Sequence, residues 1–333
     1  MTARRLHAQL AEARKHRGSL RNVQTAGPPD RSRLTSAPTP SRQSGSPQRA
    51  DRDDRNHRRL AAGARQGGGI MDLGLRDKVA VITGGSIGIG LAVAKGLAKE
   101  GAHVVLAARD GGRLEAAREE ILAAHPVEVV AVDCDVSTAL GCDRLLAATE
   151  EAFGGADILV NNAGTGSNET ILDAPDDKWQ FYWDLHVMAA VRLARGLVPS
   201  MKKRGGGVIL NNASICATQP LWYEPIYNVT KAALIMASKT MSTEFIKDNV
   251  RVNAINPGFV LTPDWIKTAT QLTADKGGDW KGYLDNLARE NAPIGRFASP
   301  EEVADFFVFL CSDRASYSVG STYFVDGGML KTI

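Results

Sequence analysis

The chain has 333 residues and a formal net charge of +3, but this charge is divided unevenly along its length. Residues 1–70 hold 15 Lys and Arg against 5 Asp and Glu, whereas residues 71–333 hold 25 basic and 32 acidic residues. The net charge of −7 on the larger part argues against nucleic-acid binding there, because such binding depends on neutralising phosphates.

Residues 1–70 contain no Phe, Trp or Tyr and are rich in Arg, Ser, Pro and Gly. We expect them to be a disordered basic extension, because they cannot bury enough apolar surface to offset the entropy lost on ordering. Three interpretations stay open: electrostatic binding of nucleic acid, an organelle transit peptide, or an extension upstream of the native start. The third is favoured, because Met71 opens "MDLGLRDKVAVITGG", where the pattern of a folded protein begins.

No stretch of the sequence has the length and apolarity of a membrane span, and no signal-peptide core precedes a cleavage site. The cysteines form neither a CxxC pair nor a regular framework, which indicates reduced thiols and a cytoplasmic protein. They are Cys134, Cys142, Cys216 and Cys311. Histidine and acidic residues show no metal-ligand spacing, so we expect no catalytic metal.

Residues 71–333 read as one α/β domain in which apolar, β-branched runs alternate with segments of helical period. The expected strands are 78–83, 103–108, 127–133, 156–162, 206–212, 250–256 and 321–326, and the expected helices are 89–100, 111–124, 140–153, 178–202, 228–247 and 300–311. Strands that are apolar on both faces predict a doubly wound parallel sheet of about seven strands with helices on both faces. The stretch 262–298 interrupts this alternation and is long enough to form a lid or helical insertion over a site.

The sequence "TGGSIGIG" follows the first expected strand and opens a helix. Its glycines permit a tight turn and a close approach of the backbone to a pyrophosphate, and the helix start offers free N–H groups to phosphates. This turn therefore predicts a nucleotide site, which would be formed by Thr83, Gly84, Ser86, Ile87, Gly88, Ile89 and Gly90.

Tyr227 and Lys231 of "YNVTK" lie four residues apart at the start of a long expected helix, so they share one face. A nearby ammonium lowers the pKa of a phenol and can make it a general acid and base near neutral pH. The pentapeptide alone favours a core Tyr and a solvated Lys, so the catalytic interpretation depends on the rest of the sequence.

Further landmarks occur in a fixed order: "DCDV" at 133–136, "NNAG" at 161–164, Ser214 at 13 residues before Tyr227, and "NPG" at 256–258. Together with the glycine turn and "YNVTK", this set resembles the short-chain dehydrogenase/reductase family in its single-domain form, over all of 71–333. The resemblance implies a Rossmann-type fold, a nicotinamide cofactor and hydride exchange between an alcohol and a carbonyl.

The resemblance assigns catalytic roles to Ser214, Tyr227 and Lys231. Tyr227 would be the general acid and base, Lys231 would lower its pKa and hold the cofactor ribose, and Ser214 would hydrogen-bond the substrate oxygen. His186 stands where the family usually has an Asn that holds a water beside the Lys. It could preserve that water, relay protons itself, or be a buried histidine in a helix interface.

The resemblance also assigns cofactor contacts. Asp135, with Val136 beside it, would meet the adenine amino group, and the "NNAG" segment would shape the adenosine side through Asn161, Ala163 and Gly164. The nicotinamide would lie beside Pro257, Gly258, Val260 and Thr262. Asn161 could equally brace the sheet, and Thr262 could equally cap the helix that begins at "PDWIK".

The choice between NADP(H) and NAD(H) is made after the second strand, where an acidic residue binds the ribose 2′-hydroxyl and an Arg accommodates a 2′-phosphate. Ala108 occupies the place of the acidic residue and Arg109 follows it, which favours NADP(H) with NAD(H) still possible. Ile87 is not the basic residue that many NADP-dependent members carry, and Asp110 could compete for Arg109.

The expected function is NADP(H)-dependent reduction of a ketone, or oxidation of a secondary alcohol, with 3-oxoacyl-thioester reduction as a close variant. Residues 165–170, 215–226 and 263–292 would face the substrate. They contain Trp222, Tyr223, Trp265 and Trp280, which favour an apolar or partly aromatic small molecule. Cys216 would line this pocket or fill the core.

An alternative function is a catalytically idle NADP(H)-binding sensor or scaffold, although idle members of such folds generally lose the Tyr or the Lys. A third is association with nucleic acid through the basic tail. By resemblance we expect a homotetramer, with neither nucleic acid nor a membrane as a partner, and with the Tyr–Lys helix and the C-terminal "YSVGSTYFVDGGM" at subunit contacts.

Overall fold

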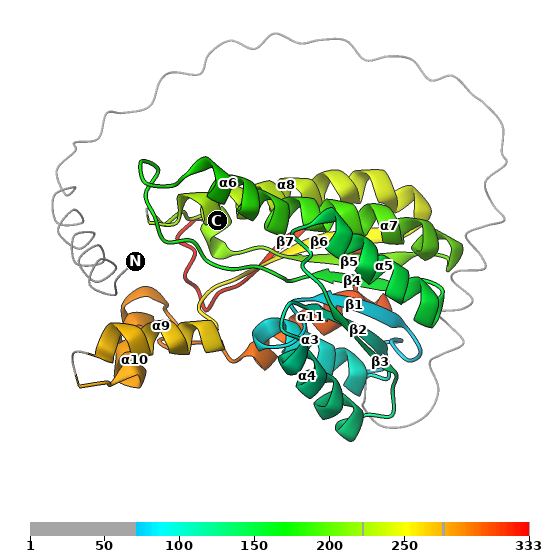
Figure 1. Cartoon of the computed structure of the whole chain (residues 1–333), viewed down its shortest axis with the longest axis horizontal. Coiled ribbons are helices and arrows are strands. Elements are labelled where there is room, and N and C mark those ends of the chain that lie inside the picture. The colour runs from blue at the N-terminus through cyan, green and yellow to red at the C-terminus, as the bar shows by residue number, and fades with distance from the viewer. Residues whose placement is uncertain (1–70, 222, 275–276, 333) are drawn as a thin grey trace, which may run out of the picture. The chain divides into compact units, whose positions relative to one another are not determined.

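The computed structural model describes residues 71–221, 223–274 and 277–332, so the expected basic extension 1–70 lies outside the described residues. The expected seven-stranded parallel sheet is confirmed, in the order β3-β2-β1-β4-β5-β6-β7 (Figure 1). Its strands are β1 (Val79–Thr83), β2 (His103–Ala108), β3 (Val129–Asp133), β4 (Ile158–Asn161), β5 (Gly207–Asn212), β6 (Val250–Pro257) and β7 (Thr322–Val325). The order reverses between β1 and β4, where a doubly wound sheet binds its ligand.

Helices cover both faces of the sheet, as the apolar character of its strands requires. Figure 1 shows α3 (Gly88–Lys99), α4 (Gly111–Ala124) and α11 (Pro300–Cys311) on one face, and α5 (Ala139–Phe153), α7 (Ala189–Lys203) and α8 (Pro225–Phe245) on the other. Each face has its own apolar core, the first centred on Leu97 and Phe307 and the second on Leu193 and Met201. Among the described residues, no helix combines the length and apolarity needed to cross a bilayer.

The segment before β5 differs from the single helix that its periodicity predicts over 178–202. The structure has α6 (Asp176–Trp183), then a π-helical segment η1 (Asp184–Met188), and then α7. A π-helical turn inserts one extra residue, which rotates the following side chains relative to an α-helix, and such turns are frequent at functional sites. Here the π-helical segment contains His186, which is buried.

The stretch 262–298 contains α9 (Pro263–Thr273) and α10 (Trp280–Asn291), which confirms the helical insertion. These two helices pack on each other and lie on the side toward which the strands' carboxyl ends point (Figure 1). Aromatic rings hold the base of the insertion, since Trp265 of α9 packs edge-on against Phe259 and Phe297 at centroid distances of 5.4 and 5.3 Å.

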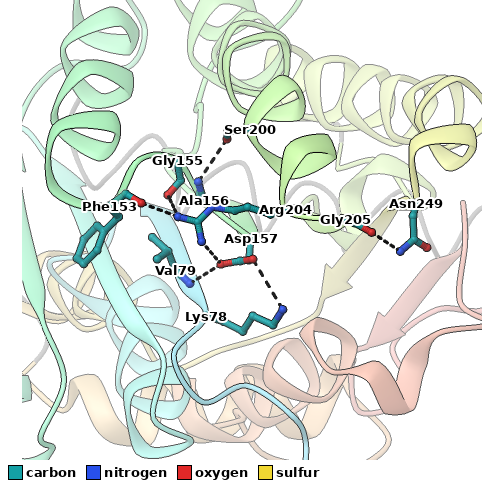
Figure 2. Close-up of polar contacts among 10 residues, drawn as sticks. All are labelled: Lys78, Val79, Phe153, Gly155, Ala156, Asp157, Ser200, Arg204, Gly205 and Asn249. Atoms are coloured by element: carbon teal, nitrogen blue, oxygen red, sulfur yellow. Dashed lines mark hydrogen bonds and ion pairs between the residues drawn. The ribbon is translucent and has the colours of Figure 1, made fainter. Parts of the chain in front are cut away.

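At the amino ends of the strands, the carboxylate of Asp157 joins three parts of the chain (Figure 2). Its Oδ2 accepts the Val79 N–H at 2.9 Å and a guanidinium N–H of Arg204 at 3.1 Å, and its Oδ1 lies 3.8 Å from Lys78 Nζ. Arg204 also donates to the carbonyl of Gly155 at 3.3 Å. This carboxylate therefore satisfies the first N–H of β1 and the end of α7 together.

We predict that Asp157→Ala lowers the free energy of unfolding by about 3 kcal/mol, because it leaves a buried N–H without an acceptor and Arg204 without its counter-ion. The matched control is Lys78→Ala, which removes an exposed and distant partner and should stay within about 1 kcal/mol of wild type. Urea unfolding at fixed protein concentration measures both. Equal effects of the two substitutions would contradict this account of the carboxylate.

Candidate active site

The glycine turn between β1 and α3 has a backbone that only glycine adopts without strain. Gly84 and Gly88 have φ values of +66° and +59°, in the left-handed region that disfavours side chains. A Cβ at Gly90 would lie 2.2 Å from the Gly84 carbonyl oxygen, so no side chain fits there. The N-cap residue Ile87 offers no side-chain bond to the start of α3. The turn therefore fits the pyrophosphate of a dinucleotide, which the first N–H groups of α3 can bind.

Two side chains brace this turn against the end of β4. The Oγ1 of Thr83 accepts the N–H groups of Asn162 and Ala163 at 2.9 and 3.0 Å. The Nδ2 of Asn162 donates to the carbonyls of Thr83 and Gly84 at 3.0 and 3.2 Å. Sequence reasoning named Thr83 but missed Asn162, because two adjacent asparagines carry no sign of which one turns toward the glycines.

The expected catalytic trio is brought together at the carboxyl ends of β5 and β6. Ser214 follows β5 and caps the short helix η2 (Ile215–Ala217), its Oγ accepting the Cys216 N–H at 3.1 Å. On α8, the Nζ of Lys231 lies 5.4 Å from the ring centroid of Tyr227 and donates to the Asn212 carbonyl at 2.7 Å. Lys231 and Ser214 are buried, whereas Tyr227 stays partly accessible, as a group that meets a substrate must be.

The protonation states of this trio are set by burial. Burial raises the pKa of Tyr227 above its ordinary value, the neighbouring Cys216 and Glu224 raise it further, and the hydrogen bond with Ser214 lowers it. Burial lowers the pKa of Lys231 from 10.5 to about 8. The expected lowering of the Tyr227 pKa by Lys231 is not among these causes, because Lys231 is already neutral where the phenol ionises. At neutral pH Tyr227 is therefore a phenol, which can donate a proton.

His186 is buried and lies beside Tyr227 and Lys231. Its Nε2 accepts the Thr165 N–H at 3.4 Å, and its Nδ1 lies 2.9 Å from Thr230 Oγ1. Because Nε2 is an acceptor, the proton of the neutral ring is on Nδ1, which donates to Thr230. Burial, and then the charge of Lys231, lower the pKa of His186 well below its ordinary value. A Cβ at Gly164 would lie 3.2 Å from the His186 Nε2 and 3.5 Å from the Lys231 Nζ, so the backbone of Gly164 lies against both side chains.

The residues expected to meet the adenosine end lie past β2, β3 and β4. Arg109 is exposed and forms no hydrogen bond or ion pair with the described residues, whereas Asp110 caps α4 and pairs with Arg113 at 3.0 Å. The carboxylate of Asp110 therefore does not compete for Arg109. Asp135 accepts the Ser137 N–H at 2.9 Å, which fixes the loop after β3, where Val136 is buried.

Asn161 takes the bracing position that the sequence left open. Its side chain is buried, and its Nδ2 donates to the Oδ1 of Asn211 at 2.8 Å, across the β4–β5 pair. Asn211 in turn donates to Ser238 of α8 at 2.8 Å. The chain from Asn161 to Ser238 ties the centre of the sheet to the helix that carries Tyr227.

The segment after β6 crosses in front of the glycine turn. A Cβ at Gly88 would lie 3.4 Å from the Thr262 methyl group, which places Thr262 beside the turn. Thr262 precedes α9 but makes no side-chain capping bond, so its hydroxyl is not used by the helix. Pro257 ends β6 and Val260 is buried against the α3 face. These positions fit the far end of a dinucleotide that begins at the glycine turn.

Sequence reasoning missed two carboxylates: Glu224, which lies next to Tyr227, and Glu169, which lies next to Glu224. Glu224 immediately precedes α8, and burial, together with the charge of Glu169, raises its pKa to about 7. A Cβ at Gly166 would lie 3.5 Å from Glu224 Oε1, so the 165–169 loop lies against this carboxylate. Glu169 is itself buried, pairs with Lys178 at 2.7 Å and has an unpartnered Oε1.

Of the aromatic residues that suggested an apolar substrate, Tyr223 lies near Cys216 and Glu224, as expected for a residue that faces the substrate. Trp222 lies outside the described residues. Trp265 packs within the insertion, and Trp280 begins α10. An acidic residue also lies near Tyr227, namely Glu224. The sequence alone does not distinguish such a residue from an acidic residue on the solvated surface.

We predict that Lys231→Met is more stable than wild type by up to roughly 3 kcal/mol at pH 7, because the folded protein then no longer holds a charged ammonium in a low-dielectric site. Between about pH 8 and 10.5 the folded wild type loses this proton while the unfolded chain keeps it, so wild-type stability rises with pH. Urea unfolding of both proteins from pH 7 to 10 should show the difference shrinking. A constant difference would contradict the lowered pKa.

Comparison with known proteins identifies the family. A family model described as enoyl-(acyl carrier protein) reductase matches residues 84–330. Dehydrogenase/reductase SDR family member 4 of Oryctolagus cuniculus is 36% identical over 255 residues, covering 76% of this chain and 94% of the relative.

Two solved structures show the range of similar proteins. The L-sorbose reductase of Gluconobacter frateurii, complexed with NADPH and L-sorbose, is 70% identical with a TM-score of 0.78, over 79% of this chain and 100% of its own. A 7α-hydroxysteroid dehydrogenase complexed with NADH is 30% identical with a TM-score of 0.70, over 79% and 99%. The chain therefore belongs to the short-chain dehydrogenase/reductase family, whose members are NAD(P)-dependent oxidoreductases of alcohols and carbonyl compounds.

Proposed function

We propose that this protein is an NADPH-dependent reductase of a polyhydroxy ketone, a ketose, and catalyses the reverse oxidation of the corresponding polyol. The observation that carries this proposal is the carboxyl group of Glu224, which immediately precedes α8 and raises the pKa of the Tyr227 phenol, with Glu169 next to Glu224. The 70% identity to an L-sorbose reductase over that protein's full length supports the same substrate class.

The carboxylates suit a substrate that is rich in hydroxyl groups. With a pKa of about 7, Glu224 is present in both forms at neutral pH: the ionised form accepts hydrogen bonds from sugar hydroxyls, and the protonated form can also donate one to a hydroxyl oxygen. No Arg or Lys lies in 215–226, so this segment offers no ionic partner to an anionic substrate. An acyl thioester, whose chain is apolar, would gain nothing from Glu224. These points favour a ketose over the 3-oxoacyl-thioester substrate.

The trio supplies the proton side of the reaction. Tyr227, protonated at neutral pH, donates its phenolic proton to the carbonyl oxygen, and Ser214 hydrogen-bonds that oxygen as negative charge develops on it. A bound nicotinamide supplies the hydride. Lys231 donates from its ammonium to the Asn212 carbonyl, and by family resemblance it would also bind the cofactor ribose. The closeness of Tyr227 to Ser214 and Lys231 supports these roles.

We assign His186 a positioning role rather than that of a proton relay. Its ring packs edge-on against Tyr182 and Tyr227, at centroid distances of 5.4 and 5.5 Å. Its Nδ1 bond to Thr230 fixes one turn of α8, since Thr230 Oγ1 donates to the Ile226 carbonyl at 2.8 Å. A relay would need a ring that gains a proton readily, and the lowered pKa opposes this.

We also propose the homotetramer that the family resemblance implies. Val229 and Met236 on the outer face of α8 are 49% and 67% exposed, and Tyr317 and Phe324 of the C-terminal segment are 102% and 37% exposed. Burying apolar side chains of this size is the ordinary driving force of stable association. The proposed contacts use the two segments that the sequence indicates.

The direct test of the function follows NADPH absorbance with purified protein and a panel of ketoses, aliphatic ketones and 3-oxoacyl thioesters. We expect ketoses, L-sorbose among them, to give the highest kcat/KM. Tyr227→Phe should still bind NADPH and lose at least about a hundredfold in kcat, the usual contribution of a general acid. Cofactor binding without turnover of any ketone would instead support the idle sensor.

The cofactor preference has its own test in Arg109, the exposed cation after β2. We predict that Arg109→Ala raises the KM for NADPH roughly tenfold, since a charge-assisted bond to the 2′-phosphate is lost, and leaves the KM for NADH nearly unchanged. The matched control is Arg113→Ala, an exposed arginine that already pairs with Asp110. Equal effects on both cofactors would overturn the assignment of Arg109.

A further inference from the structure

The C-terminal segment from Asp326 to Lys331 folds back onto the catalytic end of the sheet. Its turn is built by Asp326, whose two carboxylate oxygens accept the N–H groups of Gly328 at 3.0 Å and Leu330 at 2.8 Å. Gln219, past η2, fastens the segment: its Oε1 accepts the Lys331 N–H at 3.2 Å and its Nε2 donates to the Met329 carbonyl at 3.5 Å. The segment is therefore fixed to the loop that follows Ser214.

This segment crosses the "NPG" motif so closely that it requires the glycine there. A Cβ at Gly258 would lie 2.8 Å from the Asp326 Cα and 2.9 Å from the Met329 Sδ, distances that real Cβ atoms do not adopt. The thioether of Met329 thus lies against the backbone that leads to Val260 and Thr262. One side of Met329 faces the segment assigned to the nicotinamide end.

The side chain of Met329 also belongs to the apolar cluster around the catalytic phenol. It is 8% exposed and is buried together with Ile215 and Cys216, and Tyr227 and Phe259 pack against the same cluster. A ketone whose oxygen is bound by Ser214 and Tyr227 therefore has Met329 close to one end of its carbon chain. Sequence reasoning gave this residue only a place in a subunit contact.

Met329 also lies beside a cavity at the surface of the protein. A surface cavity of about 340 Å³ is lined by Met329 together with Arg289 and Lys331, among others. Met329 thus lines this cavity on one side and the Tyr227 cluster on the other. Ala292 also belongs to both the cavity lining and the cluster, so Met329 is the larger of the two apolar side chains that stand between them.

We propose that Met329 is a specificity-determining residue that limits the carbon-chain length of the ketone, and that Gln219 and Asp326 hold it in place. The inference rests on the proposed ketone reduction and adds which part of the chain sets the size limit. Shortening this side chain joins the substrate site to the cavity and leaves the acid, the serine and the cation untouched. Longer ketones then gain room, and ketones of the original length lose contact with this side chain.

The test measures kcat/KM with NADPH for ketoses of five, six and seven carbons and for a matching series of 2-alkanones. We expect Met329→Ala to raise the preference for the longer over the shorter chain by roughly tenfold, which is typical of one or two methylene groups in an apolar pocket. Met329→Leu, which keeps the volume, should retain the wild-type preference. The Kd for NADPH should change little in either variant.

Lys331→Ala is the matched control, because it alters the same segment and the same cavity but keeps the backbone bond to Gln219. It should leave the chain-length preference unchanged, whereas Gln219→Leu should shift it in the direction of Met329→Ala. If Met329→Ala reduces ketoses normally and its chain-length preference is unchanged, Met329 does not limit the length of the substrate, but the proposed function stands. If the chain-length preference shifts among the 2-alkanones and no ketose is reduced, the ketose substrate is refuted and the role of Met329 is supported. Binding of NADPH with no turnover of either series refutes both.

Discussion

Burial of ionisable groups at the carboxyl ends of β5 and β6 is the constraint on which the rest of the site depends. Lys231 keeps its ammonium inside the protein with a carbonyl as hydrogen-bond partner, at the cost of a pKa lowered to about 8. The same surroundings keep Tyr227 protonated and His186 neutral. The site therefore offers a proton donor, Tyr227, beside an ammonium group whose pKa is lowered. Carbonyl reduction needs a proton donor and positive charge in this combination.

The fold separates stability from chemistry along the strands. At their amino ends, Asp157 joins β1, β4 and the end of α7 through its hydrogen bonds to Val79 and Arg204 (Figure 2). At their carboxyl ends, the glycine turn, the trio and the insertion α9–α10 meet. The chain from Asn161 through Asn211 to Ser238 connects the middle of the sheet to α8, so that the helix carrying Tyr227 is held by the core rather than by loops.

Much of this could be predicted from the sequence, because the strands, the glycine turn and the Tyr–Lys spacing each follow from local geometry. What could not be predicted depends on tertiary surroundings. The π-helical segment around His186 leaves no trace in a 3.6-residue period, and the burial of Glu224 and Glu169 is invisible in a sequence where acidic residues are mostly solvated. The motif identifies Gly258 in the sequence. The structure shows why a glycine is required there: Met329, from the C-terminal segment, crosses against its backbone.

The central claim, that burial sets the proton states of the site, is tested most directly by an ultraviolet titration of phenolate absorbance. The difference between wild type and Tyr227→Phe isolates the one phenol in question. The structure predicts no phenolate from Tyr227 below about pH 10, the ordinary pKa of tyrosine. A phenolate that appears near neutral pH in that difference would contradict the account.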